Sequence, residues 1–98
     1  MMSGQTLTKT KIEESSPEVD TTGTARVILF NDDWHTFEEV INQLMLAINC
    51  SAKEGEDIAM KVHSEGQCEV FNGIMEDCLD VSGILEDIEL RTEIRFDL

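Results

Sequence analysis

The sequence predicts an α+β domain with the element order β-α-α-β-α-β, in which a small three-stranded antiparallel sheet has its helices packed on one face. Three observations indicate this fold class. A wholly apolar segment, 27–30, stops at an Asn-Asp-Asp cluster, as a strand entering a turn does. Three later segments repeat apolar residues at helical spacing. Residues 90–97 alternate between apolar and charged side chains, a pattern typical of a strand with one buried face.

Two capping boxes indicate where the first two helices begin. Thr36 is followed three positions later by Glu39, and Ser51 by Glu54, so each pair can satisfy the free N–H groups of a first helical turn. Gly66 ends the second helix. The apolar stripe expected on the first helix consists of Phe37, Val40, Ile41, Leu44 and Ile48.

The second strand and the third helix are predicted from changes in the spacing of the apolar residues. Residues 67–72 alternate apolar and polar side chains and predict a short strand. A third helix is expected from Asn72 or Gly73 onward. Its apolar stripe would consist of Ile74, Cys78, Val81, Leu85 and Ile88.

Length and composition predict one folded domain preceded by an extension. Residues 1–24 are rich in Thr, Ser, Lys and Glu and hold the one proline of the chain, Pro17. Such a segment cannot bury enough apolar surface to fold, so we expect residues 1–24 to be disordered. Residues 25–98 then form the core domain, which is long enough for one modest hydrophobic core.

The net charge of −14 restricts the partners of this domain. Its core, residues 25–98, carries five basic and seventeen acidic residues, a balance of −12. Such a surface repels phosphate, which argues against nucleic-acid binding and against anionic membranes. Basic protein partners or cationic groups of a ligand are favoured instead.

The three cysteines, Cys50, Cys68 and Cys78, form no Cys-x-x-Cys pair and are odd in number. This argues against a disulfide framework and against a zinc site, and it favours free, mostly buried thiols in a reducing compartment. No apolar run of eighteen residues and no secretory signal pattern is present. We therefore expect a soluble, cytoplasmic, monomeric protein without metal or cofactor.

One group of polar residues could form a binding site. Residues three and four apart share a face of a helix, so the second helix places Ala59, Val62 and His63 together. If this face packs beside the loop that follows the first strand, His63 approaches Asn31 and Asp32. The result is a set of hydrogen-bond acceptors, one of them charged, beside apolar side chains. A protonated amine, with three donors and one positive charge, fits such a set.

Structural interpretations of the same residues remain open at this point. Asn31, Asp32 and Asp33 can be turn residues only, and His63 can be a helix-end imidazole bonded to a carbonyl. An enzyme is less favoured, because no activated Ser or Cys accompanies Asp32 and His63. Two adjacent carboxylates alone are also a poor cation site.

Two segments resemble the ClpS family of protease adaptors. They are VILFNDDWHTFEEVI, residues 27–41, and AMKVHSEGQ, residues 59–67, and the resemblance extends over about residues 26–96. It implies a small α+β adaptor that is not an enzyme. Members of this family bind proteins whose first residue is Leu, Phe, Tyr or Trp (N-degrons). They pass these proteins to the N-domain of a Clp AAA+ unfoldase for degradation.

The resemblance also implies roles for single residues. Asn31, Asp32 and His63 would bind the substrate's α-amino group. The apolar pocket for its first side chain would be lined by Phe37, Val40, Ala59, Val62 and Leu90, with the position of Leu90 set by the register after Gly66. Further residues could lie at the rim, namely Asp33, His35, Thr36 and Met60.

Two positions depart from the family pattern. Many members have methionine at the position of Ala59, where it excludes β-branched first residues, so we expect a wider and less selective pocket here, unless the adjacent Met60 fills the space. His35 stands where other members have threonine. A second interpretation is an acidic docking domain that resembles the C-terminal domain of the ribosomal stalk protein, which would use a helix face and not the Asn31-Asp32-Asp33 loop.

Overall fold

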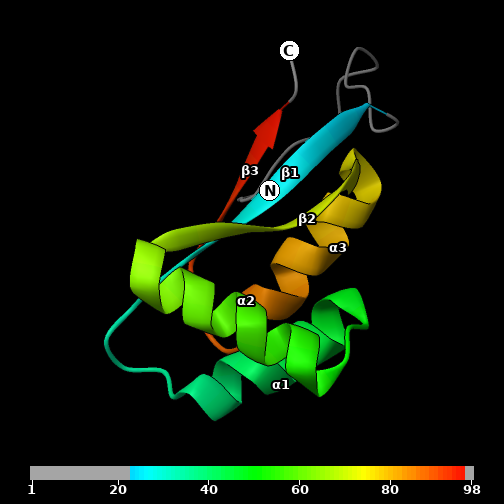
Figure 1. Cartoon of the computed structure of the whole chain (residues 1–98). Helices are drawn as coiled ribbons and strands as arrows, with labels where there is room; N and C mark the ends of the chain where they lie inside the picture. Colours follow the sequence, from blue (N-terminus) through cyan, green and yellow to red (C-terminus); the bar gives the residue numbers. More distant parts are fainter. Residues whose placement is uncertain (1–22, 97–98) are drawn as a thin grey trace.

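The computed structural model describes residues 23–96, which form three strands and three helices in the predicted order (Figure 1). The elements are β1 (Thr24–Phe30), α1 (Phe37–Ile48), α2 (Ala52–Glu65), β2 (Gln67–Ile74), α3 (Met75–Glu86) and β3 (Thr92–Phe96). The predicted α+β class is confirmed. Most of the extension predicted for residues 1–24 lies outside the described residues. Thr24 already belongs to β1, so the described fold begins one residue before the predicted boundary.

The first strand of the chain is the middle strand of the sheet. The strand order is β2-β1-β3, and both pairings are antiparallel. β1 is rich in β-branched and other apolar residues, which suits a strand with neighbours on both edges. The pairing of β1 with β2 shifts register between Val27 and Ile28, an irregularity of the kind that bends a strand.

The helices cover one face of this sheet. α3 packs against all three strands, and α1 lies against both α2 and α3 (Figure 1). The fully buried side chains that join the two layers come from strand and helix alike. The largest are Leu29, Leu44, Leu85, Val27 and Cys78. Of the cysteines, only Cys78 is buried, whereas Cys50 and Cys68 are partly exposed free thiols.

The third helix begins later than its sequence pattern predicts. β2 continues through Asn72 and Gly73 to Ile74, and α3 starts at Met75. The reason is the length of β1, whose first residue Thr24 pairs with Ile74 and keeps the backbone of residues 72–74 in the sheet. Ile74 is therefore a strand residue, 38% exposed, and not part of the buried helical stripe.

The alternation predicted for residues 90–97 holds only in part. Leu90 is buried but precedes β3, and Phe96 at the other end is 61% exposed. Phe96 pairs with Ala25 at the end of the β1–β3 ladder, so it lies at the border of the sheet. The side of β3 that faces the core is therefore shorter than the alternation of residues 90–97 predicts.

A left-handed residue between α3 and β3 gives a first testable prediction. Glu89 has φ +67°, a conformation that costs a non-glycine residue about 1 kcal/mol. We expect Glu89→Gly to raise the free energy of unfolding by about 0.5–1 kcal/mol. The matched control is Glu56→Gly in the exposed interior of α2, which should lower it by about 0.5 kcal/mol. Chemical denaturation measures both, and equal effects of the two changes would contradict the assignment of strain to Glu89.

Candidate functional site

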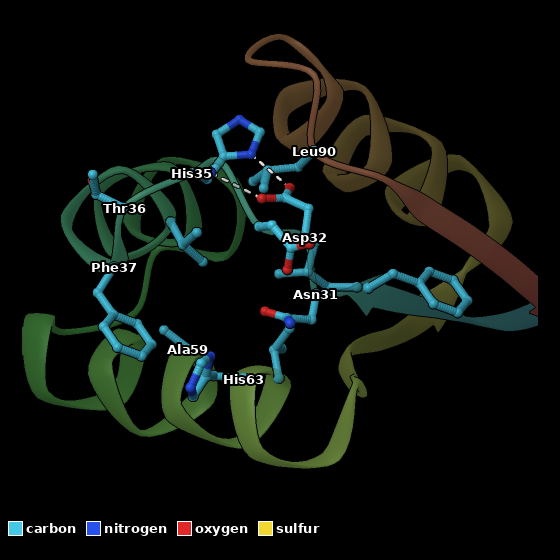
Figure 2. Close-up of a pocket in the computed structure, with 13 residues that line it drawn as sticks. Asn31, Asp32, His35, Thr36, Phe37, Ala59, His63 and Leu90 are labelled. Atoms are coloured by element: carbon cyan, nitrogen blue, oxygen red, sulfur yellow. Dashed lines mark hydrogen bonds and ion pairs between the residues drawn. The ribbon is translucent and has the colours of Figure 1, made fainter.

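A pocket of about 360 Å³ lies where the loop after β1 meets α1, α2 and the segment between α3 and β3 (Figure 2). Four parts of the chain that are distant in sequence therefore share it. The residues that line it are Leu29, Phe30, Asn31, Asp32, Asp33, His35, Thr36, Phe37, Val40, Ala59, Val62, His63 and Leu90. Met60, which was expected at the rim, is 52% exposed and is not among them.

Backbone hydrogen bonds attach the start of the loop after β1 to two other parts of the chain. The backbone N–H of Phe30 donates to the carbonyl of Arg91 (3.0 Å), and that of Asn31 donates to the carbonyl of Gly66 (2.9 Å). Gly66 ends α2 with φ +88°, a left-handed conformation that favours glycine. The same residue that ends α2 thus fixes the loop of Asn31 beside that helix. His63, one turn before Gly66, is thereby brought to the pocket.

The side chains of Asn31 and His63 are exposed at the pocket. Among residues 23–96, neither the Asn31 carboxamide nor the His63 imidazole makes a hydrogen bond. The His63 ring meets the ring of Phe37 edge-on, with 5.2 Å between centroids. Figure 2 shows His63 beside Phe37 and Ala59, on the opposite side of the pocket from the Asp32–His35 pair. Both polar groups are therefore open to a ligand.

Asp32 is held by its own loop. Its Oδ1 accepts hydrogen bonds from the backbone N–H groups of Trp34 (3.0 Å) and His35 (2.9 Å), and its Oδ2 lies 2.6 Å from His35 Nδ1. Partial burial acts to raise the pKa of the Asp32 carboxyl. The hydrogen bonds from His35 and Trp34 outweigh it, so this pKa lies below its ordinary value of 3.8. The side chain stays 21% exposed and ionised.

His35 is turned away from the solvent. Its side chain is 3% exposed, and its Nε2 lies 2.6 Å from the carbonyl oxygen of Ile88. Burial acts to lower the pKa of the imidazole, but the hydrogen bonds to Asp32 and to Ile88 outweigh it. The pKa of His35 therefore lies above its ordinary value of 6.5. A rim contact had been expected from sequence. The partner Ile88 lies far along the chain, so no local pattern could reveal this arrangement.

The apolar wall of the pocket is deeply buried. Ala59, Val62 and Leu90 are 3%, 4% and 3% exposed, respectively. Phe37, at 44% exposed, lies closer to the opening. Sequence reasoning missed Leu29 and Phe30, although their place directly before the Asn-Asp-Asp cluster could have indicated that they reach the same site.

The pocket combines hydrogen-bond acceptors with an apolar interior. A carboxylate offers about four lone-pair sites, and three of those on Asp32 are occupied within the loop. One lone-pair site on Asp32 therefore remains available, in the same pocket as the side chains of Asn31 and His63. Within residues 23–96, no cluster of three His, Cys, Asp or Glu residues could hold a metal ion. The helices of this part of the chain are all too short or too polar to cross a membrane.

This fold and pocket define a small α+β binding domain with a polar entrance and an apolar interior. The family model described as "ATP-dependent Clp protease adaptor protein ClpS" matches residues 20–92 of the chain. The chain belongs to the ClpS family, as its sequence motifs indicated. The matched residues include the loop after β1. The stalk-protein interpretation gave this loop no role in binding.

Relatives and a solved structure agree with this assignment. The human E3 ubiquitin-protein ligase UBR2 is 34% identical over 67 residues, which cover 68% of this chain. The Caenorhabditis elegans ligase ubr-1 is 32% identical over 81 residues, or 82% of this chain. The chain spans only 4% of the length of either ligase. Agrobacterium tumefaciens ClpS2, solved bound to L-phenylalaninamide, shares the fold, with a TM-score of 0.68 at 21% identity over 76% of this chain and 99% of that one.

The capping box that ends the loop gives a second prediction. Thr36 Oγ1 accepts from the Glu39 N–H (3.1 Å), and Glu39 Oε1 accepts from the Thr36 N–H (2.8 Å). Thr36→Ala removes the first of these bonds and should lower the free energy of unfolding by about 1 kcal/mol. Thr36→Ser keeps the hydroxyl and serves as the control. Denaturation midpoints measure the difference, and an equal loss in both variants would contradict a capping origin.

Proposed function

We propose that this protein binds the N-terminal residue of N-degron proteins and delivers them to a Clp AAA+ unfoldase. The observation that carries this proposal is the position of three polar groups, on Asn31, Asp32 and His63, beside one apolar pocket. A free α-amino group and a bulky first side chain need these two environments next to each other. Leu, Phe, Tyr and Trp are the first residues that we expect to bind.

The polar part of the pocket suits an α-ammonium group. Such a group has three N–H donors, and Asn31, Asp32 and His63 can each accept one of them. Hydrogen bonds that involve a charged partner contribute about 1.5–3 kcal/mol each. The acidic surface of the domain adds a long-range attraction for the same positive charge.

The apolar part suits the side chain of the first residue. Val40, Ala59, Val62 and Leu90 form the apolar lining of the pocket, whose whole volume is about 360 Å³. Burial of a Leu or Phe side chain contributes about 1.5–3 kcal/mol. Polar and apolar contributions together, less the cost of association, are consistent with a dissociation constant on the order of micromolar.

The adaptor role and the partner come from family membership. Members are described as adaptors of an ATP-dependent Clp protease, and we extend this description to delivery by the present chain. We propose a non-enzymatic, monomeric adaptor in the cytoplasm that contacts the unfoldase N-domain. Ubiquitin ligation is not transferred from the UBR relatives, because the chain corresponds to 4% of their length.

A free N-terminal amine should be required for binding. A fluorescent peptide that begins with Phe should bind with a dissociation constant on the order of micromolar. Acetylation removes the positive charge and two of the three donors, so the acetylated peptide should bind at least about a hundredfold more weakly. Fluorescence anisotropy measures both constants. Equal affinity for the two peptides would refute the proposed function.

The side chain at position 59 should set selectivity. Ala59→Met places a longer side chain in the pocket, where it would clash with a ligand branched at Cβ. We expect the affinity for peptides beginning with Ile or Val to fall about tenfold or more, and that for Phe or Leu to change less than about threefold. The wild type should accept Ile and Val correspondingly well.

The matched control for this experiment is Met60→Ala. Met60 neighbours Ala59 in sequence but is exposed and does not line the pocket, so its truncation should leave all four affinities unchanged. If Ala59→Met leaves the Leu-to-Ile affinity ratio unchanged, position 59 does not control selectivity. A change in that ratio in Met60→Ala would assign the control to Met60.

A further inference from the structure

His35 lies between two groups that can only accept hydrogen bonds. Its Nδ1 is 2.6 Å from Asp32 Oδ2, and its Nε2 is 2.6 Å from the carbonyl oxygen of Ile88. A neutral imidazole has one N–H and one lone pair, so it would direct that lone pair at an oxygen at one of these two contacts. Only the imidazolium donates at both.

The surroundings of the ring favour the positive charge. Asp32 from the loop and Glu39 from α1 are the charged groups that act on it, and both are acidic. From the segment between α3 and β3, the Ile88 carbonyl faces the ring. The Trp34 ring lies against it with 3.8 Å between centroids, and an aromatic face attracts a cation. The raised pKa of His35 agrees with this geometry.

We infer that His35 is a positioning residue of the α-amine site, which as an imidazolium fixes the Asp32 carboxylate through Nδ1–H and the pocket wall through Nε2–H. This inference rests on the proposed function, because it assigns Asp32 to the ligand's amine. His35 itself makes no contact with the ligand in this arrangement. It acts through the groups that it holds.

The first bond fixes the direction in which Asp32 can accept. With Oδ1 bonded to two backbone N–H groups and Oδ2 to His35, the carboxylate cannot rotate without losing a bond. Its one remaining lone-pair site therefore keeps a constant direction. An acceptor fixed in advance costs less to order on binding than a rotating one.

The second bond joins the loop to the segment between α3 and β3. Ile88 precedes Leu90, which lines the apolar interior, by two residues. Between them, Glu89 makes the left-handed turn of this segment. The Nε2–H bond to Ile88 thus attaches the loop of Asp32 to the segment that carries Leu90.

This arrangement predicts a pH dependence. The pKa of His35 is raised, so the imidazolium persists above pH 6.5 and is lost as the pH rises through the raised value. One of the two hydrogen bonds is then lost. The peptide's own amine also titrates, and this affects the affinity of the wild type and of a variant without the imidazole, such as His35→Gln, equally. The ratio of the wild-type affinity to the variant affinity therefore reports on His35 alone. That ratio should fall as the pH rises.

Two variants separate the two ring nitrogens. The amide nitrogen of Asn is as many bonds from Cα as Nδ1 is, and that of Gln as many as Nε2. His35→Asn can therefore keep the donor to Asp32, whereas His35→Gln can keep only the donor to Ile88. We expect His35→Gln to bind the free-amine Phe peptide about tenfold more weakly than the wild type, and His35→Asn to stay within about threefold. His35→Phe, without either donor, should resemble His35→Gln.

The protonation state of His35 can be measured in the wild type, so this test does not require that any variant folds. In ¹⁵N NMR at pH 6.5, where an ordinary imidazole is half protonated, the His35 ring should be predominantly doubly protonated. A ring with one unprotonated nitrogen would overturn the inference. Circular dichroism checks that each variant has the wild-type fold.

The peptide results separate this inference from the proposed function. If the wild type fails to distinguish the free from the acetylated peptide, the proposed function is wrong, and the positioning role is wrong with it. If the wild type distinguishes them and all His35 variants bind equally well, the positioning role alone is wrong. Equal losses in His35→Asn and His35→Gln would show that the bond to Asp32 is not what positions the amine site. A wild-type-to-His35→Gln ratio that rises with pH would show that the imidazolium charge opposes the ligand. Either result overturns the inference.

Discussion

The position of β1 as the middle strand is the constraint on which the candidate binding site depends. β1 pairs with both other strands, and at its end Phe30 donates to Arg91 while Asn31 donates to Gly66. These two bonds attach the start of the loop to the segment before β3 and to the end of α2. The three parts of the chain that form most of the pocket therefore meet at the end of a single strand. A change in the register of β1 would separate them.

The charges of the site act at two ranges. At long range, the excess of acidic residues attracts a cationic group. At short range, Asp32 is paired with His35, so in the proposed function the pocket entrance would distinguish a ligand by hydrogen-bond geometry as well as by charge. A carboxylate that is paired in this way stays ionised and oriented, whereas an isolated exposed carboxylate is free to rotate.

The Asp32–His35 pair also contributes to stability within a definite pH window. The contribution of His35, whose pKa is raised, is complete below pH 6.5 and is lost as the pH rises through that raised value. The contribution of Asp32, whose pKa is lowered, is complete above pH 3.8 and is lost as the pH falls through the lowered value. Both groups contribute fully between these two limits.

Local sequence determined much of this protein. The apolar run before Asn31, the capping boxes at Thr36 and Ser51 and the left-handed glycine at position 66 specify strand, helices and turn through contacts within a few residues. These short-range effects also place Ala59, Val62 and His63 on one helix face. The family resemblance then assigned the candidate site, whose residues, except Met60, the fold brings to one pocket.

Tertiary structure decided what depends on distant partners. The stretch from Asn72 to Ile74 remains a strand because Thr24 pairs with Ile74, although a helical pattern runs through it. His35 is buried because the carbonyl of Ile88, 53 residues away, accepts its Nε2–H. A pattern of neighbours in sequence cannot contain such information. The energy that selects the conformation comes from a group that only the folded chain brings within hydrogen-bonding distance.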